Sequence, residues 1–183
     1  MNIFETNATQ LRDLHAAIKN AFRRRNEGDS EWKAWEEACR RFHTSYDALA
    51  FPGGLGNAMS LLQKNDPSTV EMVIRFLEAD PRYFRSGYHK EYMIKELHNA
   101  SLTEDQRKRL QQVILARIED RKTPREFRRY CRLARFVADA DFERVVASLA
   151  ESSGSARSRH AQWVLAQIRP GPGASRPREG DCK

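Results

Sequence analysis

The chain has little cysteine, and its cysteines are poorly placed to stabilise a fold through disulfides or a bound metal. Its 183 residues include three cysteines, Cys39, Cys131 and Cys182, whose separations match neither a disulfide framework nor a zinc site. The acidic and histidine residues of one central helix also lack zinc-ligand spacing; these are His89, Glu91 and His98. We therefore expect reduced thiols, no metal site and no cofactor.

Long hydrophobic runs are also missing. No stretch approaches the ~20 apolar residues that a membrane-spanning helix needs. The first residues, MNIFETNATQL, lack the basic segment, apolar core and small-residue cleavage site of a secretory leader. These absences predict a cytoplasmic protein without a membrane span.

Recognisable catalytic motifs are absent, so the sequence does not point to one specific activity. His43 and Asp47 are four residues apart and share a helical face, but no Ser or Cys nucleophile is evidently placed beside them. A hydrogen-bonded structural pair is the favoured interpretation. The glycine-rich loop FPGGLGN, residues 51–57, lacks the lysine and hydroxyl residue of a P-loop and follows no strand, which favours a flexible turn. An enzyme using these residues is our third hypothesis, and no catalytic residue is assigned.

Most of the remaining sequence features predict helices. A chain of this length buries roughly 70% of its unfolded surface, so we expect one all-α domain over residues 1–169. The stretch 66–100 predicts two helices folded back on each other. Asp66 is placed to cap the first helix, with Pro67 at its first position, and Pro81 ends the apolar periodicity. The second helix follows Gly87 and is expected to bury four residues: Tyr88, Tyr92, Met93 and Leu97.

Similar start signals return twice downstream. Thr103 opens the next helix pair and forms a capping box with Gln106; its return helix is predicted to begin at Thr123. A third pair starts near Asp139 or Asp141. The starts at Asp66, Thr103 and Asp139 are 37 and 36 residues apart. This spacing lies between the ~34 residues of tetratricopeptide repeats and the ~40–47 of HEAT or armadillo repeats.

One helix carries a family resemblance. The segment ARSRHAQWVLAQI, residues 156–168, resembles the second helix of a HEAT repeat, in which an arginine precedes a leucine-rich face. The resemblance extends over residues 66–169 by period alone. It implies antiparallel helix pairs stacked as a short right-handed HEAT-like α-solenoid, which binds a partner on a helix-lined surface. A compact helical bundle without true repeats is the alternative that the sequence leaves open.

An N-terminal helical hairpin over residues 7–49 is predicted to cap the repeats. Its first helix, residues 7–27, has one apolar face formed by Leu11, Leu14, Ile18, Ala21 and Phe22. The second helix begins at Asp29 or Ser30. It carries an aromatic stripe at helical spacing, which is Trp32, Trp35, Cys39, Phe42 and Tyr46. We expect this stripe to be core; an exposed partner groove or a base-stacking surface are the alternatives.

Positive charge is concentrated in one part of the chain. The formal net charge is +7, yet residues 107–135 hold eleven basic residues against only Glu119, Asp120 and Glu126. A basic surface of this kind favours an anionic partner, which is nucleic acid, an acidic protein surface or phospholipid.

Six arginines around the predicted helix after Thr123 cluster on one side of it, opposite its apolar face. They are Arg121, Arg125, Arg128, Arg129, Arg132 and Arg135. Together they predict a basic ridge about four helical turns long, able to make bidentate contacts to carboxylates or phosphates. Secondary candidates come from the segment DPRYFRSGY, which interleaves basic and aromatic residues; these are Arg82, Arg85 and Tyr88.

Our leading hypothesis is a non-catalytic helical-repeat module that binds a protein partner, such as an adaptor or a toxin-neutralising immunity protein, through the arginine ridge. Nucleic-acid binding through the same ridge is the alternative. Residues 170–183, rich in proline, glycine and charge, are predicted to be disordered. The sequence does not predict the oligomeric state.

Overall fold

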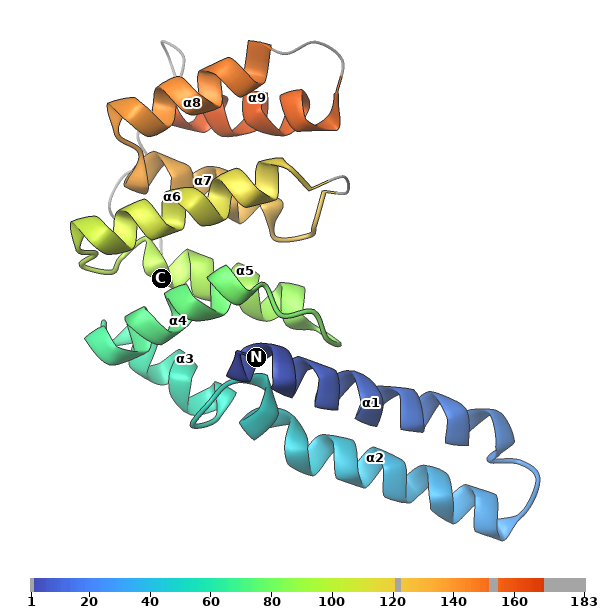
Figure 1. Ribbon diagram of the computed structural model, residues 1–183. Coiled ribbons are helices and arrows are strands. Elements are labelled where there is room, and N and C mark those ends of the chain that lie inside the picture. Colours follow the sequence, from blue (N-terminus) through green and yellow to red (C-terminus); the bar gives the residue numbers. More distant parts are fainter. Residues whose placement is uncertain (1, 121–122, 152–154, 170–183) are drawn as a thin grey trace, which may run out of the picture. The chain divides into compact units, whose positions relative to one another are not determined.

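The computed structural model describes residues 2–120, 123–151 and 155–169, and these residues form helices and connections without any strand (Figure 1). This confirms the all-α fold class. The helices in this part of the chain are α1 Ile3–Arg24, α2 Asp29–Ala50, α3 Leu55–Gln63, α4 Pro67–Ala79, α5 Ser86–Leu97, α6 Glu104–Ile118, α7 Phe127–Val137, α8 Ala140–Glu151 and α9 Ala156–Ile168. None of them is long and apolar enough to cross a membrane.

The contacts divide the chain into two compact units, Met1–Arg109 and Leu110–Lys183, with the boundary inside α6. Because this boundary falls within a helix, the sequence prediction of one domain over residues 1–169 stays a prediction. The solenoid arrangement stays one as well. The tail over residues 170–183 lies outside the described residues.

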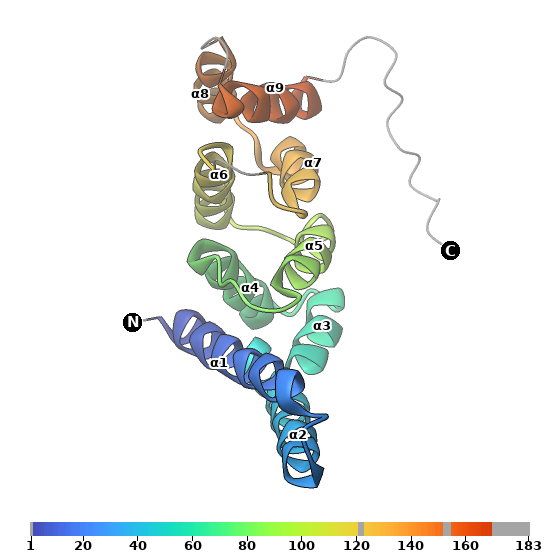
Figure 2. The same cartoon turned by 90° about the vertical axis from the view of Figure 1, so that its right-hand side faces the viewer.

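In the first unit, α1 and α2 form a hairpin in which the two helices lie side by side (Figures 1 and 2). The first helix begins four residues earlier than predicted, because the Asn2 side chain accepts a hydrogen bond from the Phe4 amide and caps it. The most buried residues of the hairpin lie toward its base. There Phe4 packs on Phe51 and Phe76, at ring separations of 5.8 and 5.3 Å, and Leu11 is fully buried.

The outer half of this hairpin contradicts the prediction of an aromatic core. No residue from Arg12 to Arg41 is buried. Trp32 is 44% exposed and Phe22 47% exposed, while Phe42 alone of the predicted stripe is buried. The physical reason is position along the hairpin. Near the base Arg12 donates to the Arg82 carbonyl and His15 packs on Phe84, whereas further out Phe22 and Trp32 pack on Trp35 of the hairpin itself.

The centre of the first unit follows the sequence prediction closely. Asp66 caps α4 by accepting the Thr69 amide at 2.8 Å, and Pro67 occupies the first helical turn. The apolar face of α4 is buried as expected, with Val73 and Ile74 fully inaccessible. In α5 the prediction is half right, since Met93 and Leu97 are buried but Tyr88 is 54% exposed.

The turn between α4 and α5 is held by buried polar groups. Asp80, in a left-handed conformation at the end of α4, pairs with the buried ammonium of Lys90 at 2.5 Å. The Tyr83 hydroxyl lies 3.1 Å from both the Ala50 carbonyl oxygen and His89 Nδ1. Since the carbonyl only accepts, the hydroxyl proton points to Ala50 and His89 Nδ1–H donates to Tyr83.

The predicted capping box at the start of α6 is present. The Gln106 amide donates to Thr103 Oγ1 at 3.2 Å, and the Thr103 amide donates to Gln106 Oε1 at 3.1 Å. Two donors that a helix N-terminus would leave unpaired are thereby satisfied.

The second unit contains the rest of α6 with α7, α8 and α9. The buried Gln111 amide donates to the Val137 carbonyl at 2.7 Å and to Asp139 Oδ2 at 2.8 Å, which ties α6 to the junction between α7 and α8. Asp139 Oδ1 also accepts the Phe142 amide, so of the two predicted starts for the third pair Asp139 is the capping residue. Figures 1 and 2 show α8 and α9 side by side.

Candidate functional site

The arginines of α7 face away from a fully packed helical side. This helix buries Phe127, Tyr130, Cys131, Leu133, Ala134 and Val137. Arg128, Arg132 and Arg135 are exposed, and their spacing of four and three residues places them on one face. The sequence prediction of opposed apolar and basic sides is therefore confirmed for this part of the ridge.

The ridge is shorter than predicted. The helix begins at Phe127 and not at Thr123, and Arg125 lies in the turn before it. Instead of capping α7, the Thr123 hydroxyl bonds to Nε2 of His160 at 2.8 Å, which draws the segment toward α9. Arg129 is half-buried at the side of the helix. Arg121 lies outside the described residues, so its place in the ridge is untested.

Three ridge arginines lack carboxylate partners. Arg128, Arg132 and Arg135 form no ion pair within the described ranges. Other arginines of the second unit are paired: Arg117 with Asp120, Arg144 with Asp141, Arg157 with Glu119 and Arg169 with Glu143. Of the other described arginines in this unit, Arg159 alone shares this lack of an ion pair, so most of the described uncompensated charge lies on the outer face of α7.

Two of these arginines border a groove of about 460 Å³ between α7 and α9. Its α7 wall is formed by Arg128, Cys131 and Arg132, and its α9 wall by Trp163, Ala166 and Gln167. Trp163 is 51% exposed. A guanidinium pair and an accessible indole therefore meet over one concave surface.

Sequence reasoning missed Trp163. The residue was noticed only as part of the HEAT-like segment, although a signal was available. In α9 the buried positions are Ser158, His160, Ala161 and Val164, and Trp163 falls on the opposite, otherwise polar side. Because tryptophan and arginine are enriched in protein interfaces, a tryptophan on the solvent side of a helix is a binding-site signal when arginines border it.

His160 supports the α9 wall of the groove. It is 2% exposed, and its Nδ1 lies 3.3 Å from the Ile118 carbonyl. Because the carbonyl only accepts, Nδ1 carries the proton and Nε2 accepts from the Thr123 hydroxyl. The His160 ring stacks on Phe127 at 4.6 Å and touches Trp163 at 5.8 Å. These contacts fix the indole from one side and leave its other side accessible.

The groove between α7 and α9 holds one thiol, and burial limits the reactivity of that thiol. Its one sulfur nucleophile, Cys131, is 5% exposed, and burial raises the pKa of its thiol to about 12. The thiolate that nucleophilic catalysis requires is therefore scarce at neutral pH.

The secondary candidates lie in the first unit, around the turn before α5 and its first residues. Arg82 pairs with Asp80, and its carbonyl accepts a hydrogen bond from Arg12. Tyr88 is exposed and lines no described pocket. Arg85, with a left-handed backbone at φ 68°, borders a separate pocket of about 480 Å³ and stacks over Phe84 at 5.4 Å.

That pocket also holds the residues of the enzyme hypothesis. Cys39, His43 and Asp47 lie at successive four-residue steps of α2 and all line it, so a thiol does stand one turn from His43. The sequence interpretation overlooked this. No hydrogen bond joins any two of the three within the described residues, and Asp47 Oδ1 instead accepts the Gly56 amide at 3.0 Å. Asp47 thus holds the 51–57 loop and does not orient His43.

Comparison with protein-family models, curated proteins and solved structures finds no match. Among the described residues, no group of three His, Cys, Asp or Glu side chains is arranged to hold a metal ion. The groove between α7 and α9 is accordingly judged on its own geometry.

Proposed function

We propose that this protein is a non-catalytic helical interaction module whose groove between α7 and α9 binds an acidic segment of a protein partner. The observation that supports it is the placement of Arg128 and Arg132, which have no carboxylate partner among the described residues, beside the exposed indole of Trp163. Arginine and tryptophan are the residue types most enriched at the energetic centres of protein interfaces.

The two guanidinium groups determine which side chains the partner segment must carry. Residues four apart on a helix have Cβ atoms about 5–6 Å apart. Such a pair suits two nearby carboxylates, each taken in a bidentate contact. Trp163 supplies apolar area next to them, so the complementary segment combines acidic side chains with at least one apolar or aromatic one.

A short acidic segment fits this surface better than the extended backbone of a nucleic acid. A nucleic-acid groove needs a continuous track of cations, because each bound phosphate contributes to affinity. Here the arginines outside the α7 face that are named above are neutralised by Asp or Glu. Within the described residues of this unit, the arginines without an ion pair are three on α7 and Arg159, and this limited extent suits a short peptide.

The proposal retains the helical-repeat interpretation. Its support is the recurrence of similar start signals, since Asp66, Thr103 and Asp139 each accept a backbone amide at a helix start about one repeat apart. A repeat array leaves its outer helix faces open to vary, which suits a protein that evolves toward one partner.

The test is fluorescence anisotropy with a labelled peptide of alternating glutamate and leucine, measured beside labelled single-stranded and duplex DNA and RNA over a salt series. We expect the peptide to bind. The double variant Arg128→Glu, Arg132→Glu and the variant Trp163→Ala should each weaken binding roughly tenfold or more.

The matched control is Arg135→Glu, Arg159→Glu. It makes the same change in net charge at two exposed positions of the same unit that do not line the groove. Equal losses in both double variants would show a diffuse charge effect and contradict the groove. Tight, salt-sensitive nucleic-acid binding without peptide binding, lost in the groove variant, would replace the protein partner with the nucleic-acid alternative.

A further inference from the structure

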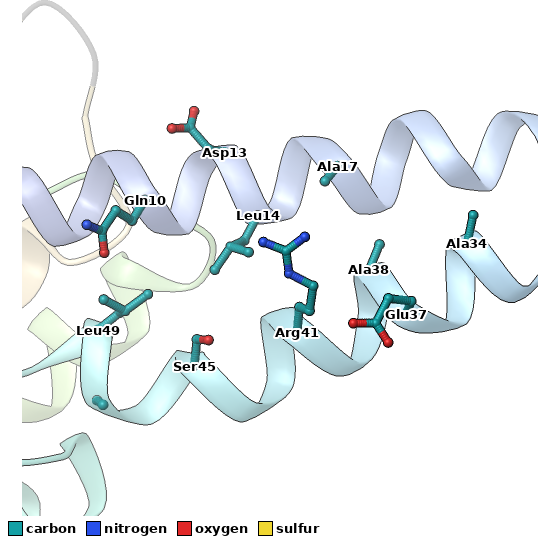
Figure 3. A pocket seen from close by; sticks show the side chains of 11 residues that line it. Gln10, Asp13, Leu14, Ala17, Ala34, Glu37, Ala38, Arg41, Ser45 and Leu49 are labelled. Atoms are coloured by element: carbon teal, nitrogen blue, oxygen red, sulfur yellow. The ribbon is translucent and has the colours of Figure 1, made fainter.

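The hairpin of α1 and α2 has a groove of its own, separate from the groove between α7 and α9. A groove of about 710 Å³ runs between the two helices (Figure 3). Its lining includes four alanines, Ala17, Ala34, Ala38 and Ala48, together with Leu14 and Leu49. Ala34 also borders a second hollow of about 440 Å³ nearer the tip. We call this combined surface the alanine face.

The small side chains of the alanine face allow another helix to pack closely against it. Helix axes pack 8–10 Å apart depending on the side chains between them, and alanine permits the closest approach. Both helices have 22 residues, so each is about 33 Å long, and the face is about two helix diameters wide. An area of this size approaches the ~800 Å² per partner that a standard interface buries.

Three charged residues line the groove, Asp13, Glu37 and Arg41, and of these Glu37 is already paired with Arg40 of its own helix. Asp13 on α1 and Arg41 on α2 line the same groove, and neither side chain has a hydrogen bond or ion pair to another described residue. Figure 3 shows Arg41 extending from α2 into the space between the helices, with Asp13 on α1. Each therefore offers one unmatched charge, and the two are of opposite sign.

We propose that the alanine face binds the same face of a second copy of this chain, forming an antiparallel four-helix bundle. A twofold axis parallel to the helices places α1 of each copy over α2 of the other. In such an isologous contact, Asp13 of one copy meets Arg41 of the other, and the reciprocal pair forms by symmetry. Each helix then has only antiparallel neighbours, as in the up-down-up-down bundle.

The charge of the hairpin agrees with self-association. Residues 2–50 contain eight basic and eight acidic side chains, so two copies meet without net repulsion. A strongly acidic or basic partner would gain nothing from this balanced surface. The basic excess of the chain lies elsewhere, within residues 107–135.

The experiment is the mass of the full chain in solution by sedimentation equilibrium across a concentration series. We expect twice the chain mass of 21.2 kDa. Asp13→Arg and Arg41→Asp should each shift the protein to monomer, because each sets like charges against one another. The double swap Asp13→Arg, Arg41→Asp should restore the dimer.

A second pair of variants tests the packing. Ala17→Glu places a charge in the groove, whereas Ala16→Glu makes the same change at the neighbouring exposed residue, which does not line it. Only Ala17→Glu should yield monomer, and far-ultraviolet circular dichroism should show unchanged helix content in both. A wild-type monomer at every concentration, or a dimer indifferent to these variants, would overturn the proposal and leave the alanine face to a different protein.

Discussion

Arg109 makes a bidentate ion pair with Glu78, its Nε lying 2.7 Å from Oε1 and its Nη2 2.8 Å from Oε2. The same guanidinium reaches Glu71 at 2.8 Å, so one arginine at the start of α6 binds two carboxylates of α4. Donation of hydrogen bonds to Glu78 and Glu71 raises the pKa of Arg109. Burial acts to raise the pKa of Glu71, but the hydrogen bonds from Arg109, Gln106 and Arg75 outweigh it and lower that pKa. Arg109 belongs to the basic stretch over residues 107–135 that the sequence analysis assigned to a positive surface, but here it stabilises the fold.

Replacing Arg109 should destabilise the protein. We expect Arg109→Ala to lower the free energy of unfolding by about 1–2 kcal/mol, because the network is bidentate and only partly exposed. Gln112→Ala is the control on the same helix, since Gln112 is exposed and has no hydrogen bond to another described residue, and it should change little. Urea unfolding followed by circular dichroism measures both. Equal stability of Arg109→Ala and the wild type would contradict the structural role.

Gly54 is required by its neighbour Asp47. A Cβ at Gly54 would lie 2.6 Å from Asp47 Oδ2, and the backbone there has φ +91°. We expect Gly54→Ala to cost roughly 1–3 kcal/mol of stability through this clash and the left-handed strain.

Gly53 provides the comparison, because it shares the left-handed backbone at φ +80° but a Cβ there would meet nothing within 4 Å. Gly53→Ala should therefore cost only the strain, about 1 kcal/mol. In an Asp47→Ala background the two alanine variants should have similar costs, measured by thermal and urea unfolding. A Gly54→Ala cost that persists there would show that the clash is not the cause.

His89 should make stability depend on pH. Burial, with a smaller effect of the Arg85 charge, lowers the pKa of His89 from 6.5 to about 4. The folded protein therefore holds the neutral ring, and protonation favours unfolding. This contribution is complete above pH 6.5, is lost as the pH falls toward 4, and amounts to about 3 kcal/mol.

The measurement is the free energy of unfolding in urea at several pH values between 7 and 4, for the wild type and for His89→Asn. The variant cannot titrate, so the wild type should lose more stability than the variant over this range. Parallel pH profiles would show that His89 is solvated in the folded state. Asp66 and Glu71, whose lowered pKa values also contribute at the acid end, are common to both proteins.

Sequence reasoning was most successful where a signal acts locally. The cap at Asp66 with Pro67 beside it, the capping box of Thr103 and Gln106, and the opposed faces of α7 are each set by neighbours within a few residues. It was wrong about the start of α7, because Thr123 finds a better partner in His160, 37 residues away.

By itself, then, the sequence determined that this chain is helical, where most of its helices begin, and which side of each carries charge. Only the tertiary structure decided which apolar residues are covered and which charges are neutralised. Trp32 has the helical spacing of a core residue yet remains exposed, and Arg109 is paired while Arg128 has no ion pair among the described residues. The physical reason is that capping and amphipathic periodicity depend on residues a few positions apart, whereas burial and ion pairing depend on elements far apart in the chain.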